Sequence, residues 1–124
     1  MKKLITIVSA TLLFSCFSMA QNTEPTKQNN EKVATFAGGC FWCVEKAFQT
    51  LNGVDKVISG FSGGHVKNPS YKEVMTGKTG HYEVIQVYFN PNKISYELLL
   101  KVFWENIDPT DEIGQFSDKG PQYR

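Results

Sequence analysis

The stretch GGCFWCVEKAF, Gly38–Phe48, decides how the chain is organised. Just before it, VATFA at 33–37 forms a short apolar run that is typical of a β-strand. The two glycines let the backbone turn sharply, and apolar residues then recur at helical spacing as far as Asn52-Gly53. The sequence therefore predicts a strand, a tight turn and a helix that begins just after Cys40.

The rest of the chain extends this pattern. Residues 54–61 and 82–89 are rich in β-branched and aromatic side chains and predict two more strands, with one helical turn at 71–75 between them. A helix capped by Ser95 is expected through Asn106, and a Gly- and Asp-containing tail follows at 110–124. A polar loop is the simplest interpretation of its last seven residues, with Asp118, Gly120, Gln122 and Tyr123. The order β-α-β-β-α predicts an α/β (α+β) class, with a split β-α-β-β-α-β ferredoxin-like core. We expect the closing strand and the C-terminal region of that core to be missing.

The N-terminal region has the features of an export signal. Residues 1–20 begin with two lysines, continue with an apolar run and end in small residues, which predicts a signal peptide cleaved after Ala20. A competing interpretation is a lipoprotein signal with Cys16 as the lipidated residue. Both interpretations place the mature protein outside the cytoplasm, in the periplasm or another extracytoplasmic space. Residues 21–32 then predict a flexible spacer before one domain at 33–124.

Charge and cysteine content narrow the possible functions. The chain has 13 basic and 12 acidic residues, a net charge of +1, so we expect no nucleic-acid partner. With Cys16 inside the signal, only Cys40 and Cys43 remain, too few for a disulfide framework. They are a redox pair, a metal pair or ordinary packing residues.

Cys40 lies at the expected helix start, where unpaired N–H groups and the helix dipole favour a thiolate. Cys43 follows one turn later, within disulfide reach after local adjustment. The alternative is that both are small packing residues, with Cys43 facing the core. Phe41 and Trp42 could likewise belong to the core, or could line an apolar pocket beside the reactive sulfur.

Glu83 is the strongest candidate for an acid. Alternation along 82–89 puts its carboxyl on the same face as Ile85 and Val87. Burial on an apolar face raises the pKa of a carboxyl and suits a general acid. The alternative is a strand-end side chain that turns back to solvent.

A metal site is a weaker hypothesis. His65 and His81 could join Cys40 and Cys43, but the two histidines are sixteen residues apart and lack the usual zinc spacing. Local hydrogen bonding in loops is the simpler interpretation of both. We expect no metal and no organic cofactor.

Several separated motifs resemble the type A peptide methionine sulfoxide reductase family. They are GGCFWC, SGFSGGH, NPSYKEV, TGHYEVIQVYFNP, LLLKVFWENIDPTD and GQFSDKGPQYR, in that order, between about Val33 and Arg124. Chains of this family continue well past QYR, so the resemblance implies a catalytic domain that is incomplete at its C-terminus. One departure is Phe61, where the family usually has Tyr.

The resemblance implies a set of roles. Cys40 would be the nucleophile and Glu83 the general acid, and the remaining site residues would be Tyr71, Tyr123, Phe41, Trp42 and Asp118. The implied reaction converts the S epimer of methionine sulfoxide, free or in peptides and proteins, to methionine and leaves a sulfenic acid. Cys43 is the candidate that resolves it, and an external thioredoxin-like or small-thiol reductant completes the cycle. We expect a monomer.

Two other functions remain open on the sequence. A C-x₂-C pair at a helix start also fits a general disulfide oxidoreductase, although Glu83 and the two tyrosines would then have no role. The other alternative is an inactive or metal-clipped binding fragment.

Overall fold

The computed structural model describes residues 30–124 of the 124-residue chain. The main sheet and its helices are β1 (Lys32–Ala37), α1 (Phe41–Gln49), β2 (Val54–Ser62), α2 (Tyr71–Val74), β3 (Tyr82–Phe89) and α3 (Tyr96–Glu105). A small hairpin, β4 (Gly114–Gln115) and β5 (Asp118–Lys119), and a 3₁₀ turn, η1 (Pro121–Tyr123), follow. The predicted signal peptide, Cys16 and most of the predicted spacer lie outside the described residues.

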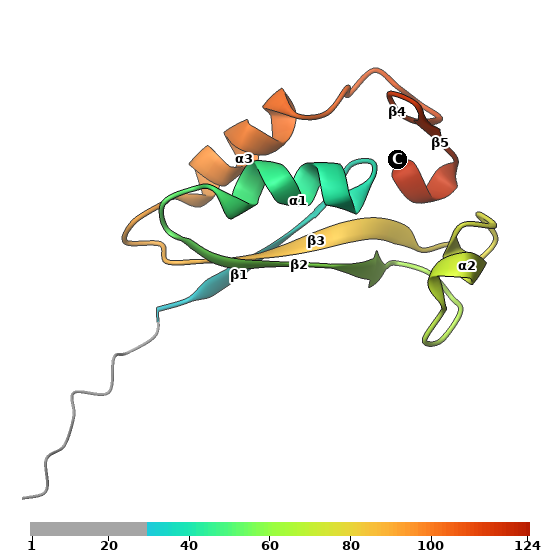
Figure 1. Cartoon of the computed structure of the whole chain (residues 1–124), viewed down its shortest axis with the longest axis horizontal. Coiled ribbons are helices and arrows are strands. Elements are labelled where there is room, and N and C mark those ends of the chain that lie inside the picture. Colours follow the sequence, from blue (N-terminus) through green and yellow to red (C-terminus); the bar gives the residue numbers. More distant parts are fainter. Residues whose placement is uncertain (1–29) are drawn as a thin grey trace, which may run out of the picture.

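The sheet has the strand order β1-β3-β2, and β3 is antiparallel to both neighbours. β1 and β2 are therefore parallel to each other, with β3 between them, which is the split β-α-β arrangement predicted from the element order. Figure 1 shows α1 and α3 together on one face of this sheet, and α2 beyond its end. The predicted fold class is confirmed. In residues 30–124 no strand lies on the free side of β1.

Three phenylalanine rings join the sheet to both helices. Phe36 of β1 stacks on Phe48 of α1 and on Phe103 of α3, with both centroid distances at 5.1 Å. All three side chains are buried, and Ile85 of β3 and Leu99 of α3 are fully buried beside them. Burying each such side chain contributes about 1.5–3 kcal/mol, so these contacts fix the helix layer on the sheet.

The helix starts differ in a way that matters for the site. Ser95 caps α3 by accepting a hydrogen bond from the N–H of Leu98, as predicted, and Ser70 forms a capping box with Glu73 at α2. At α1 the N-cap residue is Cys40, and its side chain makes no capping hydrogen bond. The N-terminus of α1 is thus left for other partners.

The tail at 110–124 contains regular structure, and a simple polar loop for its last seven residues is wrong. It forms the β4–β5 hairpin and η1, and it buries the side chains of Gln115 and Gln122. Its strands are two residues each, too short to show alternation in the sequence. Figure 1 places the end of this segment beside the start of α1.

Within residues 30–124, no helix is both long and apolar enough to span a bilayer.

Candidate active site

Sheet topology brings the cysteine turn and Glu83 together. β1 and β3 are antiparallel neighbours, and Ala37 at the end of β1 pairs with Val84 near the start of β3. The chain leaving β1 reaches Cys40 three residues after Ala37, while Glu83 precedes Val84. Residues 43 positions apart in the sequence therefore meet at one end of the sheet.

Cys40 occupies the N-cap of α1 in an extended conformation, with φ −60° and ψ 118°. Its carbonyl accepts hydrogen bonds from the N–H groups of Cys43 and Val44, at 3.0 and 3.2 Å. The residue is half-buried and its thiol is free. The N-terminal end of a helix favours negative charge, so this position suits a reactive thiolate.

The two glycines before Cys40 are required by close packing. A Cβ on Gly38 would lie 2.8–2.9 Å from atoms of Phe103 and Ile107. Gly39 has φ +90°, and a Cβ there would lie 2.8 Å from Gln115. The turn that carries Cys40 is therefore packed between α3 on one side and β4 on the other.

Glu83 is 2% exposed, and its carboxylate accepts a hydrogen bond of 2.9 Å from the N–H of Phe41. Burial raises the pKa of Glu83, the hydrogen bond from Phe41 opposes that effect, and the charge of Asp118 adds to it. The protonated carboxyl keeps one oxygen to accept from Phe41 and gains an O–H to donate. The alternative in which Glu83 turns to solvent is wrong.

Four aromatic rings pack together around Phe41, the residue that follows Cys40. Phe41 is buried, and its ring centroid lies 5.7 Å from Trp42, 5.8 Å from Phe61 and 6.4 Å from Tyr71. Trp42 is 67% exposed and Tyr71 is 49% exposed. Phe41 thus forms the buried base of this aromatic cluster, while the rings of Trp42 and Tyr71 are largely exposed.

Tyr123 reaches the same site from η1. Burial, and then the negative charge of Glu83, raise the pKa of Tyr123, which keeps its hydroxyl protonated. That hydroxyl donates to the sulfur of Met75 at 3.1 Å. The sequence-based prediction did not include Met75; its position four residues after Tyr71, on the same side of a helical turn, was the available signal.

Asp118 lies in β5, within range of the other candidates. Its charge raises the pKa values of Glu83, Cys43 and Tyr123, although it is the largest cause for none of them. Together with the contacts above, this places all the predicted site residues around the N-terminal end of α1.

Cys43 is exposed, so the alternative that it faces the core is wrong. Desolvation of its thiol, and then the neighbouring Cys40, raise the pKa of Cys43. The raised pKa favours the protonated thiol of Cys43.

The histidines do not join the cysteines. The Nδ1 atom of His81 accepts from the N–H of Gly64 at 3.2 Å, and its Nε2 lies 2.8 Å from the carbonyl oxygen of Val66. The prediction of local hydrogen bonding is thus confirmed for His81. In the described part of the chain, no three His, Cys, Asp or Glu side chains are grouped so as to hold a metal ion.

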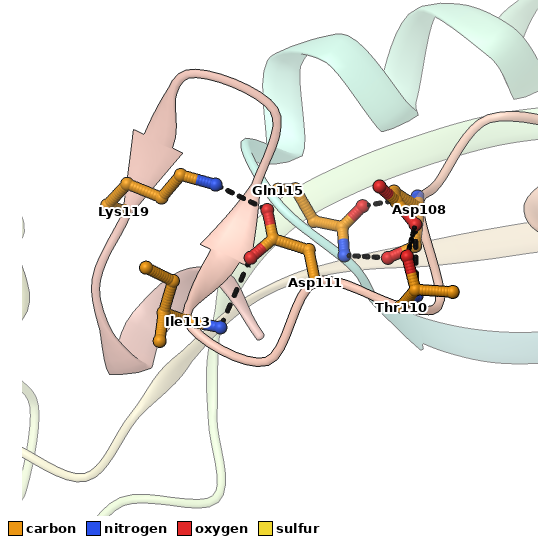
Figure 2. A network of polar contacts seen from close by, with 6 residues as sticks. All are labelled: Asp108, Thr110, Asp111, Ile113, Gln115 and Lys119. Atoms are coloured by element: carbon orange, nitrogen blue, oxygen red, sulfur yellow. Dashed lines mark hydrogen bonds and ion pairs between the residues drawn. The ribbon is translucent and has the colours of Figure 1, made fainter.

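Two buried glutamines near the site were also missed. Gln115 bonds both the N–H and the C=O of Asp108, as Figure 2 shows. Gln122 is 5% exposed, and its side-chain oxygen has no hydrogen-bond partner among residues 30–124. No signal in the sequence indicated either, because a glutamine in a loop is ordinarily exposed.

Comparison with known proteins gives a consistent result. The family described as peptide methionine sulfoxide reductase matches residues 32–124. The peptide methionine sulfoxide reductase MsrA of Listeria monocytogenes is 58% identical over 99 residues, which are 80% of this chain and 55% of that protein. The corresponding protein of Bacillus subtilis is 53% identical over 94 residues, 76% of this chain and 53% of that protein.

Solved structures agree. The methionine sulfoxide reductase A of Corynebacterium diphtheriae superposes with a TM-score of 0.72 at 37% identity, covering 79% of this chain and 46% of that one. Reduced Mxr1 of Saccharomyces cerevisiae gives 0.71 at 37% identity, covering 76% and 56%. The chain spans about half the length of the curated relatives it matches. The resemblance seen in the motifs is confirmed, and the chain belongs to the peptide methionine sulfoxide reductase A family.

Proposed function

We propose that this chain reduces the S epimer of methionine sulfoxide, free or within peptides and proteins, to methionine at the expense of thiols. The observation that carries the proposal is the bond between the buried Glu83 carboxyl and the N–H of Phe41. It sets a proton donor beside the helix start that bears Cys40. Membership of the family supports the same reaction.

In the first step the Cys40 thiolate attacks the substrate's sulfur atom. The sulfur–oxygen bond of the sulfoxide breaks, the oxygen is transferred to Cys40 as a sulfenic acid, and methionine leaves as the thioether. Glu83 supplies the proton that the oxygen needs as negative charge builds on it. Tyr123 and Tyr71 donate hydrogen bonds to that oxygen.

The aromatic cluster provides the discrimination between epimers. Phe41 and Trp42 form an apolar wall that receives the methyl group of the substrate, and Glu83 and Tyr123 hold the oxygen. With the methyl group, the oxygen and the rest of the methionine chain each assigned a direction from sulfur, the opposite epimer would direct its oxygen against the rings. That arrangement leaves a polar oxygen without a partner and is disfavoured.

Cys43 resolves the intermediate. Its thiol condenses with the sulfenic acid of Cys40 to form a disulfide and release one water. Once Cys40 is a neutral sulfenic acid, its charge no longer raises the pKa of Cys43, so Cys43 loses its proton more readily. Two thiol equivalents, from a thioredoxin-like protein or a small thiol, then reopen the disulfide.

The test of the reaction is thiol-dependent turnover of separated S and R epimers by the purified chain and by Cys40→Ser. We expect turnover of the S epimer alone, and none in Cys40→Ser. Reduction of insulin serves as the comparison, because a general disulfide oxidoreductase would reduce insulin and spare both epimers. Turnover of both epimers, or of neither, would contradict the proposal.

The role of Cys43 has its own test. The parent and Cys43→Ser are mixed with the S epimer in the absence of reductant and analysed by mass spectrometry after one turnover. We expect a disulfide in the parent and a trappable sulfenic acid in the variant, with one methionine released by each. Identical oxidised products from the two proteins would exclude Cys43 as the resolving residue.

Export from the cytoplasm is proposed on residues 1–20 alone, with their charged start and apolar run. Fractionation of cells that express the chain checks it: the protein is expected in the extracytoplasmic fraction, and its recovery in the cytoplasm at full length would refute export.

A further inference from the structure

Gln115 is a buried amide whose two ends bind the same residue. Its Oε1 accepts the N–H of Asp108 at 2.6 Å, and its Nε2 donates to the C=O of Asp108 at 2.8 Å. Figure 2 shows this pair of bonds, which resembles the pairing of two antiparallel strands. Gln115 is 6% exposed, and both bonds are partly buried. A side chain that both donates and accepts is required, which an amide provides and an ionised carboxylate does not.

The aliphatic part of Gln115 contacts the turn that carries the nucleophile. A Cβ on Gly39 would lie 2.8 Å from Cβ and 3.0 Å from Cγ of Gln115. Gly39 directly precedes Cys40 and has φ +90°. The side chain of Gln115 therefore packs so closely on the backbone at Gly39 that only a residue without a side chain fits there.

The backbone of Gln115 continues this connection into the site. Gln115 pairs with Asp118 across the β4–β5 hairpin, and Asp118 is the residue whose charge acts on Glu83 and Cys43. One residue thus touches the Gly39-Cys40 turn, fixes the Asp108 loop and pairs with Asp118.

The charged groups nearby have other partners and do not compete for the amide. The carboxylate of Asp108 accepts from the N–H and hydroxyl of Thr110. Asp111 pairs with Lys119 and accepts from the N–H of Ile113, as Figure 2 also shows. The bonds from Gln115 are therefore the ones that tie the Asp108 backbone to β4.

We infer that Gln115 is a positioning residue, which locks the Gly39-Cys40 turn to the hairpin so that the Cys40 thiol is held at the N-terminus of α1. It acts through Cys40 and does not touch substrate. The inference deepens the proposed function and rests on it for its effect on turnover, but its effect on the thiol can be measured without any sulfoxide.

The primary experiment measures the rate of Cys40 alkylation by iodoacetamide, resolved by peptide mass spectrometry, in the full chain. Gln115→Met keeps the volume and the contact with Gly39 but loses both bonds to Asp108. We expect its Cys40 to react at least fivefold more slowly than in the parent, because the loosened turn no longer holds the thiol at the helix end. Gln86→Glu is the matched control, because Gln86 is exposed on the opposite face of the sheet.

Gln115→Glu gives a second, reversible measurement. When protonated, the new carboxylic acid both donates to and accepts from Asp108; when ionised, it only accepts. The ratio of its Cys40 alkylation rate to that of the parent is expected to approach one at acid pH and to fall as pH rises. In Gln115→Met and Gln86→Glu the same ratio is expected to be independent of pH.

The outcomes separate the two proposals. A Cys40 rate in Gln115→Met that is unchanged or faster, with only a lower urea midpoint, overturns the inference and leaves the proposed function standing. A slowed Cys40 in a chain that reduces neither epimer supports the inference and contradicts the proposed function. If Gln115→Met does not fold, the pH profile of Gln115→Glu decides: a flat ratio overturns the inference. With sulfoxide, a positioning role is expected to lower kcat at least fivefold with KM unchanged.

Discussion

Glu83 combines two demands that usually conflict in one side chain. It occupies a core-facing position of β3, where an ionised carboxylate is unfavourable, and it accepts the N–H that the start of α1 leaves free. Burial is the larger effect and raises the pKa of Glu83. A carboxyl with a raised pKa holds its proton more tightly in the folded state than in the unfolded state.

This difference predicts a pH dependence of stability. The favourable contribution is complete below the ordinary carboxyl pKa of 4.5 and is lost as pH rises through the raised folded value. Within that window the free energy of unfolding should fall as pH rises, by at most about 1.4 kcal/mol per pH unit from this one group. Glu83→Gln, which keeps an acceptor for Phe41, is expected to remove this contribution and to lower turnover about 10²–10⁴-fold, because the acid proton is gone.

Urea unfolding from pH 4 to pH 8 provides the measurement. Glu105→Gln is the control, because Glu105 is an exposed partner of Lys101 on α3 and should leave the slope unchanged. If the parent and Glu83→Gln show the same pH dependence, burial of the charge at Glu83 does not govern it.

At this scale the sequence predicted Glu83 and Cys40 because periodicity or a helix start reports their surroundings. Alternation in β3 identifies the buried face, and the glycines mark the turn before α1. Gln115 bonds Asp108 seven residues away in an irregular segment, where no periodicity marks a buried side chain. Met75 shares a helical turn with Tyr71, but its contact with Tyr123, 48 residues away, is not encoded by any local pattern.

The helices and strands also divide into those that the sequence predicted and those that it did not. The three strands of the main sheet and the helices α1 and α3 are long enough for their periodicity to be visible in the sequence, and the structure has them where the sequence predicted. β4 and β5 have two residues each, and the turn between them holds Phe116 with φ +51°, a conformation that favours glycine. The sequence therefore offered neither alternation nor the usual turn residue to indicate a hairpin.

The junction of β1, α1 and α3 yields a prediction about glycine. Gly38→Ala would place a methyl group 2.8–2.9 Å from Phe103 and Ile107, so we expect a loss of about 1–3 kcal/mol in the free energy of unfolding. Turnover should fall as well, because the displaced turn carries Cys40. Urea denaturation and the S-epimer assay measure the two effects.

Gly60→Ala is the matched control for that substitution. A Cβ at Gly60 in β2 would meet nothing within 4 Å, so alanine there is expected to be neutral or to stabilise by about 0.5–1 kcal/mol. Equal losses at the two positions would mean that the contact with α3 is not the reason for Gly38.

At the scale of the whole molecule, the aromatic core and the candidate site are adjacent on one sheet. Phe36, Phe48 and Phe103 fix α1 and α3 on the sheet. Phe36 is the next-to-last residue of β1, and the loops at the end of β1 and the start of β3 carry the candidate site. Figure 1 shows α2 and the C-terminal segment converging on that same end. A rigid sheet can therefore hold several loops in register for chemistry, as in other folds with sites on loops.

The last prediction follows from this arrangement. Phe36→Ala removes a ring that stacks on both α1 and α3, so it is expected to lower the free energy of unfolding by about 3–5 kcal/mol. Val33→Ala, on the same strand but 49% exposed on the opposite face, is the control and should change it by about 0.5 kcal/mol or less. Trp42 lies on α1 and Trp104 lies on α3, so the tryptophan fluorescence signal includes a contribution from each helix. If Phe36 joins both helices to one core, tryptophan fluorescence and circular dichroism should show a single transition that shifts together in Phe36→Ala. If fluorescence and circular dichroism gave different transitions in the parent, α1 and α3 would unfold independently of the sheet that links them.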